Sequence, residues 1–337
     1  MLDYSKARVQ GEIAPAIIRH MFTADPSAHV FNGKLYIYPS HDKAHDGSSN
    51  DNGDQYQMED YHVFSMESPD GPVTDHGMVL HEKDVPWVSE RMWAPDAATK
   101  NGKYYLYFPA RDKDGIWRIG AAVADKPEGP FTPEADYIQG TYSIDPAVFV
   151  DTDNEAYLYV GGLWGGQLEK WESGSFDPTV GNFQGEKGKK QFAPLVAKLN
   201  DDMVSLAEPL KDLLIVDEAG EVLDSTHEHR FFEAAWLHTY KGKYYFSYST
   251  GDTHCIAYAI GDSPYGPFTY KGVVLNPVIG WTNHHSIVEW QGKWYIFYHD
   301  CSLPESAGTN HKRSVKFAEI TYNPDGTIQT LDPYPNA

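Results

Sequence analysis

The chain has 337 residues, a formal net charge of −21 and an isoelectric point near 5.0. A negative field of this size repels phosphate backbones and anionic lipid surfaces, so we expect neither nucleic acid nor a membrane as a partner. The sequence has no run approaching the roughly 18 apolar residues of a transmembrane helix, and its start lacks the pattern of a secretory signal. We therefore expect a cytoplasmic protein, unless an export signal has been removed.

The first strand signals form pairs that recur along the chain. Five segments each place a tight turn before an aromatic strand: FNGKLYIY from Phe31, KNGKYYLYF from Lys100, TDNEAYLYV from Thr152, YKGKYYFSY from Tyr240 and QGKWYIFY from Gln291. Asn-Gly and Lys-Gly supply the positive φ angles that a two-residue hairpin turn requires. The strands before the turns are AHVF, DAAT, PAVFV, AAWLHT and SIVEW. The sequence therefore predicts five β-hairpins.

A third shared element extends several of these hairpins. SMESPDGPV, ADKPEGPFT and GDSPYGPFT each place a Pro-x-Gly-Pro turn after a further strand. Five units of three or four strands predict an all-β protein folded as a five-bladed β-propeller, with a two-sheet sandwich as the alternative. We expect one catalytic domain over residues 1–337, with blade repeats from about residue 20. The polar stretches 40–60 and 172–191 are interpreted as loops inserted into blades one and three.

Cys255 and Cys301 lie in strand-like segments. A disulfide framework in a chain this long would need more cysteines, so we expect both to be reduced packing residues.

Polar residues stand at the equivalent place in every hairpin, about eight residues before the turn. They are Asp25, Asp96 in the segment WAPD, Asp145, Glu233 and the pair His284–His285. Because the inner strands of a propeller run along its axis, we expect Asp25, Asp145 and Glu233 to face one another across one end of the channel. Burial and like charge then raise the pKa of at least one carboxyl group. A protonated acid beside an ionised one is suited to cleaving glycosidic bonds.

A single Asp-Pro pair is usually only a turn or strand entry, which is the alternative for Asp25 taken alone. Glu233 is different because FF and AAW flank it, and an unused carboxylate among apolar neighbours costs desolvation free energy. We therefore expect Glu233 to be the acid with the raised pKa.

The motifs ADPSAHVF, MWAPDAA, SIDPAVF, FFEAAWL and NHHSIVEW resemble, in order and spacing, those of glycoside hydrolase family 43. This family of five-bladed propellers includes β-xylosidases, α-L-arabinofuranosidases and arabinanases, and the resemblance runs from about residue 20 to the C-terminus. It implies an inverting mechanism with Asp25 as general base and Glu233 as general acid. Asp145 would hold the acid in place and tune its pKa.

The resemblance also implies less specific assignments. Trp93 resembles an aromatic platform near the sugar, with a core tryptophan as the alternative, and Arg313 resembles an arginine that contacts sugar hydroxyls, with a surface strand residue as the alternative. His284 matches a histidine that in many members coordinates a central calcium ion surrounded mostly by water. Calcium prefers oxygen ligands, so a metal-free channel histidine is the alternative, and His285 could exchange roles with His284. No cofactor is expected to be required for the chemistry itself.

These features together predict an exo-acting inverting glycosidase that removes xylose or arabinofuranose from short hemicellulose-derived oligosaccharides. Long loops in blades one and three would close a pocket and favour exo cleavage. An endo-arabinanase with an open groove is one alternative. A sugar-binding propeller without catalysis is another. The oligomeric state stays open.

Overall fold

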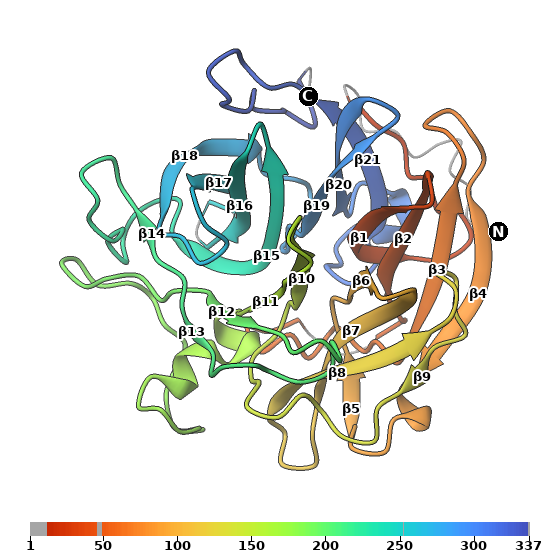
Figure 1. Ribbon diagram of the computed structural model, residues 1–337, viewed down its shortest axis with the longest axis horizontal. Helices are drawn as coiled ribbons and strands as arrows, with labels where there is room; N and C mark the ends of the chain where they lie inside the picture. The colour runs from red at the N-terminus through yellow and green to blue at the C-terminus, as the bar shows by residue number, and fades with distance from the viewer. Residues whose placement is uncertain (1–11, 46–48, 252, 336–337) are drawn as a thin grey trace.

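The computed structural model describes residues 12–45, 49–251 and 253–335. Five β-sheets surround a central axis (Figure 1), as the repeats predict. Helical structure in these ranges consists of short 3₁₀ turns: Glu82–Asp84, Trp164–Gly166, Leu168–Trp171 and Pro304–Ser306. Within the same ranges no helix is long and apolar enough to cross a membrane.

The first three blades follow one another along the chain. Blade one contains β1 (Thr23–Phe31), β2 (Lys34–His41), β3 (Asp60–Met66) and β4 (Thr74–His81). Blade two contains β5 (Glu90–Met92), β6 (Asp96–Lys100), β7 (Lys103–Arg111), β8 (Trp117–Ala124) and β9 (Thr132–Pro133). Blade three contains β10 (Ala147–Val150), β11 (Ala156–Val160), β12 (Leu195–Lys198) and β13 (Lys211–Asp212).

The last two blades differ at their outer edges. Blade four contains β15 (Phe231–Tyr240), β16 (Lys243–Thr250), β17 (Ile256–Gly261) and β18 (Phe268–Leu275), and β14 (Ile215–Val216) runs parallel to β18. Blade five contains β19 (His285–Trp290), β20 (Lys293–Asp300) and β21 (Ser314–Ile320). The N–H groups of Ile17 and Thr23 donate to the carbonyls of Val315 and Arg313, so the N-terminal segment lies along β21. This contact joins the first blade to the last and closes the ring.

The five predicted hairpins are confirmed. Their first strands are β1, β6, β10, β15 and β19, and each pairs antiparallel with the strand that follows. The Asn32–Gly33 turn has φ angles of 53° and 81°, as a two-residue hairpin turn requires. The Asn-Gly, Lys-Gly and Gln-Gly turns of blades two, four and five share these positive angles.

The inner strands line the axis. β1 contacts β6 and β19, β10 contacts β6 and β15, and β15 contacts β19, so the five form a closed ring (Figure 1). Apolar and aromatic side chains fill the space between neighbouring blades, with Tyr38, Tyr107 and Trp290 almost fully buried. Cys255 and Cys301 are free and buried, as predicted.

Candidate active site

One pocket contains every predicted site residue. Asp25, Trp93, Asp145, Glu233, His284 and Arg313 all line it. Five of them come from the starts of inner strands or from segments next to those starts, so a position repeated in the sequence becomes one end of the channel. Arg313 instead directly precedes β21, the third strand of blade five. The pocket therefore brings together three carboxyl groups that are more than 200 residues apart at their extremes.

The backbone turns sharply beside each carboxyl group. Asp25 and Asp145 have positive φ angles of 48° and 57°, and Ala234, the residue after Glu233, has 61°. The pairing register also shifts between Ala24 and Ser27 and around Glu233. A left-handed conformation is unfavourable for alanine and is tolerated by aspartate, and residues held in it occur at turns and at functional sites. Here they recur beside the carboxyl groups at three strand entries.

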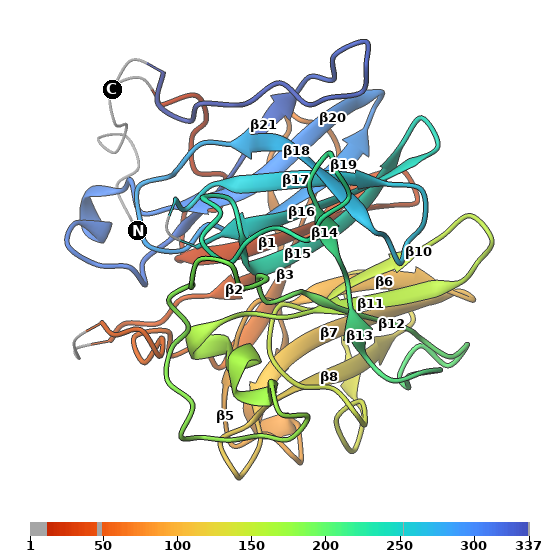
Figure 2. The same ribbon diagram turned by 90° about the vertical axis from the view of Figure 1, so that its left-hand side faces the viewer.

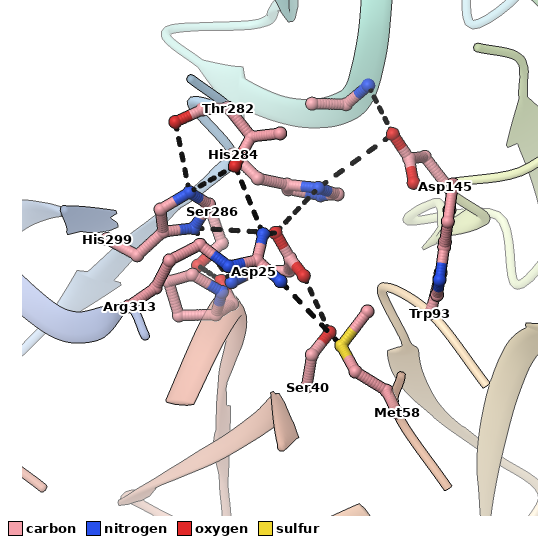
Figure 3. A network of polar contacts seen from close by, with 12 residues as sticks. Asp25, Ser40, Met58, Trp93, Asp145, Thr282, His284, Ser286, His299 and Arg313 are labelled. Carbon is pink, nitrogen blue, oxygen red and sulfur yellow. Dashed lines mark hydrogen bonds and ion pairs between the residues drawn. The ribbon is translucent and has the colours of Figure 1, made fainter. Parts of the chain in front are cut away.

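The Asp25 carboxylate is held at both oxygens (Figure 3). Ser40 Oγ donates to Oδ2 at 2.6 Å, and Arg313 Nη1 donates to Oδ1 at 3.0 Å. His299 Nδ1 accepts the Asp25 backbone N–H at 2.9 Å. Burial alone would raise the pKa of Asp25, but Arg313, His299, His284 and the Ser40 hydrogen bond outweigh it and lower this pKa to about 2. Asp25 is therefore ionised at neutral pH.

Asp145 and Glu233 are the other two carboxyl groups of the pocket. The Ala234 N–H donates to Asp145 Oδ2 at 2.8 Å, which ties Asp145 to the residue beside Glu233. Burial and the charge of Asp25 raise the pKa of Glu233 to about 8, although Arg313 opposes the shift. Burial and the charges of Glu233 and Asp25 also raise the pKa of Asp145 well above its usual range. The two groups titrate as a coupled pair that retains a proton at neutral pH.

Arg313 is buried between charged and aromatic partners. Its Nε and Nη2 atoms donate to the two oxygens of Asp42 at 2.9 and 2.8 Å. The ring of Tyr56 lies 4.6 Å from the guanidinium carbon. The interpretation of Arg313 as a surface strand residue is therefore wrong, because its side chain is only 3% exposed.

The two adjacent histidines point to different environments. His284 lines the pocket, and its Nδ1 atom lies 3.8 Å from both Asp25 Oδ1 and Asp145 Oδ2 (Figure 3). His285 is fully buried, with Nε2 2.6 Å from Ser247 Oγ. Of the two candidates for a metal ligand, His284 is thus the one beside the carboxyl groups. Whether it binds calcium stays a prediction.

Trp93 supports the pocket from below the surface. The residue is 8% exposed, its ring centroid lies 4.4 Å from that of Trp117, and its Nε1–H donates to the Tyr56 carbonyl at 3.0 Å. A Cβ atom at Gly53 would lie 2.5 Å from the Trp93 ring. Trp93 therefore lines the pocket although most of its side chain is buried in the core. Its role as a sugar platform stays a prediction.

The predicted loop 40–60 contributes to the pocket wall, but the predicted loop 172–191 provides no lining residue. The lining residues of blade three, 163–166, lie between β11 and that stretch. Figure 2 shows the loop after β2 and the insertion after β11 at the same end of the molecule, and both contain pocket-lining residues. Their backbones meet, because a Cβ atom at Gly165 would lie 2.9 Å from the Asn52 carbonyl oxygen. The Glu169 carboxylate accepts the N–H of Trp164 at 2.9 Å and so holds the second loop. Trp164 and Trp281 stand at 6.1 Å from each other among the lining residues.

Residues 74–328, about three quarters of the chain, match the model of Glycosyl hydrolases family 43. The chain belongs to glycosyl hydrolase family 43. Membership makes this protein a glycoside hydrolase.

Several family 43 proteins are similar over nearly their whole length. Xylosidase/arabinosidase 43A of Humicola insolens is 62% identical, with 94% of this chain and 99% of that protein covered. Xylosidase/arabinosidase of Bacteroides ovatus is 52% identical, with 92% and 95% covered. The crystal structure of a family 43 β-xylosidase/α-arabinofuranosidase from a compost metagenome, in complex with xylotriose and described as calcium-free, has a TM-score of 0.92 and 57% identity, with 96% and 99% covered.

Sequence reasoning missed part of this family 43 site. Asp42, Tyr56 and His299 contact Arg313 or Asp25, yet Asp42 and Tyr56 belong to the stretch interpreted as a polar loop. A usable signal existed for Asp42. β2 pairs antiparallel with β1, and Thr23 lies opposite His41, so the residue after β2 must lie near Asp25.

A separate group of metal-binding residue types lies on blade one. His41, Asp60 and His62 place ligand atoms within 4.8 Å of one another. However, His41 Nδ1 at 2.5 Å and Lys43 Nζ at 2.7 Å already pair with the Asp60 carboxylate. We interpret this group as a network of ion pairs.

Proposed function

We propose that this protein is an inverting exo-glycosidase that removes terminal β-xylosyl and α-L-arabinofuranosyl units from hemicellulose-derived oligosaccharides. The observation that carries the proposal is the opposite protonation of two carboxyl groups in one pocket. The pKa of Asp25 is lowered to about 2 and that of Glu233 is raised to about 8. At neutral pH an ionised base therefore stands in the same pocket as a protonated acid.

The chemistry follows from these two states. Asp25 accepts a proton from a water molecule as the water oxygen bonds to the anomeric carbon. At the same time the glycosidic C–O bond breaks, and Glu233 gives its proton to the departing oxygen. Asp145, bonded to the Ala234 N–H, fixes the backbone beside the acid. Its carboxyl group interacts electrostatically with Glu233, so the two groups together retain the proton that the acid delivers.

Substrate class is supported by relatives and by the pocket wall. Both curated relatives described above are named xylosidase/arabinosidase, and the compost enzyme was solved with xylotriose. The contact between the loops at Asn52 and Gly165 narrows the site on one side, which suits the end of a chain better than its middle. An open groove for an endo-arabinanase is not favoured. A silent sugar-binding protein has no need for an acid like Glu233.

A substrate panel tests this proposal. We expect release of 4-nitrophenol from the β-D-xyloside and the α-L-arabinofuranoside, and single sugars rather than oligosaccharides from xylotriose. Proton NMR during hydrolysis of 4-nitrophenyl β-xyloside, whose leaving group is not a sugar, should show α-xylose as the first product. Absence of turnover on both aryl glycosides and on arabinan would favour a binding protein, and oligomeric products would favour endo action. A β-anomeric first product would contradict inversion.

Calcium at His284 belongs to the same proposal. His284 offers one imidazole nitrogen, with carboxylate oxygens nearby, which fits a hydrated calcium ion that takes most of its oxygen ligands from water. When bound, the ion would supply positive charge that favours ionised carboxylates in the pocket.

We expect a chelator to lower the melting temperature by a few degrees and calcium to restore it, because a ligand that binds only the folded state stabilises it. The measurement is a thermal melt of the chelated protein with calcium or magnesium added back, alongside His284→Ala. If neither the chelator nor added calcium changes the melting temperature, the protein does not bind calcium at His284.

A further inference from the structure

We infer that Asp42 is a positioning residue for the reaction: it clamps Arg313 so that the guanidinium fixes the orientation of the Asp25 carboxylate. This inference rests on the proposed function, in which Asp25 is the general base. Asp42 itself has no contact with the reacting atoms in this account. It acts through Arg313.

The clamp has the geometry of a planar two-point ion pair. Arg313 Nε donates to Asp42 Oδ2 at 2.9 Å, and Nη2 donates to Oδ1 at 2.8 Å. The Arg313 backbone N–H also donates to Asp42 Oδ2 at 2.9 Å. The Asp42 side chain has no exposed surface. A buried bidentate ion pair fixes the plane of the guanidinium group more strictly than a single hydrogen bond to one carboxylate oxygen would.

Because Asp42 holds the Nε and Nη2 atoms of Arg313, the position of the third nitrogen, Nη1, is fixed as well. Arg313 Nη1 donates to Asp25 Oδ1 at 3.0 Å and to Thr282 Oγ1 at 3.1 Å. The remaining Nη2–H approaches Met58 Sδ at 3.7 Å. All five N–H donors of Arg313 therefore have protein partners. A bond from Arg313 to a sugar hydroxyl would require one of these contacts to be exchanged, so Arg313 acts first on Asp25.

Asp25 is sensitive to this arrangement because its carboxylate is held at two ends. Ser40 fixes Oδ2, Arg313 fixes Oδ1, and His299 and His284 lie at 3.4 and 3.8 Å from Oδ1. The Asp42 backbone N–H donates to the Phe22 carbonyl at 3.1 Å, which ties the clamp to the chain just before Asp25. Loss of the clamp would let the guanidinium turn and release one oxygen of the base.

The direct test is Asp42→Asn, with Asp60→Asn as the matched control. Asp60 lies in the same blade and also forms ion pairs, but its partners are His41 at 2.5 Å and Lys43 at 2.7 Å instead of Arg313. We expect Asp42→Asn to lower kcat about 10- to 100-fold, the typical loss from misplacing a catalytic group by about 1 Å. The loss should be similar for 4-nitrophenyl β-xyloside and xylobiose, because both need the base, and KM should change little. Asp60→Asn should leave kcat unchanged.

A double-mutant cycle separates positioning from a purely structural role. If Asp42 acts through Arg313, Asp42→Asn/Arg313→Gln should have the same kcat as Arg313→Gln alone. Losses that multiply would overturn the inference, as would a rise in KM with unchanged kcat. Asp42→Glu retains the charge but displaces the carboxylate by one methylene group. It therefore provides a second variant if Asp42→Asn does not fold, and it should also lose kcat.

A crystal structure of the same variant gives a readout that needs no substrate. In Asp42→Asn, or Asp42→Glu, Arg313 Nη1 should move out of hydrogen-bonding distance of Asp25 Oδ1. If Nη1 stays, Asp42 is not what positions it, and the inference is wrong. If the wild-type protein turns over none of the glycosides, the proposed function fails while this structural result still stands.

Discussion

Asp25→Asn should lower kcat/KM by about 10²- to 10⁴-fold on every glycoside, whatever its leaving group, because each one needs an activated water. Asparagine keeps the shape of the side chain and its contact with Ser40, but it cannot accept a proton. The measurement is kcat/KM for 4-nitrophenyl β-xyloside, 2,4-dinitrophenyl β-xyloside and xylobiose. The ratio of variant to wild type should be nearly the same for all three.

Two controls distinguish loss of the base from loss of folding or of sugar binding. The melting temperature tests folding, since Asp25 lies in a buried network with Arg313 and Ser40. Xylose binding by calorimetry tests the pocket and should be retained within a few-fold. A loss confined to xylobiose would assign Asp25 to the leaving group instead of the water and would reverse the proposed roles.

Glu233→Gln should show the opposite dependence on the leaving group. Hydrolysis of xylobiose should fall by about 10²- to 10⁴-fold, because an alcohol leaves poorly without protonation. Hydrolysis of 2,4-dinitrophenyl β-xyloside should fall much less, since that group departs without an acid. Equal losses on the two substrates would mean that Glu233 is not the general acid.

The pH profile gives an independent signature of the same residue. Glu233 acts in its protonated form and has a pKa raised to about 8, so kcat/KM of the wild type should fall as pH rises through about 8. Asp145 is coupled to Glu233, so this limb belongs to the pair. With xylobiose, which needs the acid, the decline should be present in the wild type and disappear in Glu233→Gln. A limb that stays in place would assign it to another group.

The repeats in the sequence determined most of the fold. Local turn chemistry sets each hairpin, as at Asn32–Gly33, because the φ angles that the turn needs depend on the residues at the turn itself. Once five hairpins are arranged around an axis, the residues that begin their inner strands must meet. For this reason Asp25, Asp145 and Glu233 could be predicted from their spacing to share one cavity.

Features that depend on long-range packing required the tertiary structure. Asp42 stands in a polar stretch, and its burial against Arg313, 271 residues away, arises only when the last blade closes against the first. His284 and His285 differ because adjacent residues of an extended segment point to opposite sides. Trp93 takes its place from the packing of blade two against the loops that contain Gly53 and Gly165. The sequence by itself determined which acids converge, because strand position is local and periodic. Only the tertiary structure decided which charges and hydrogen bonds surround each acid, because these come from distant segments, and they set the pKa values that distinguish the base from the acid.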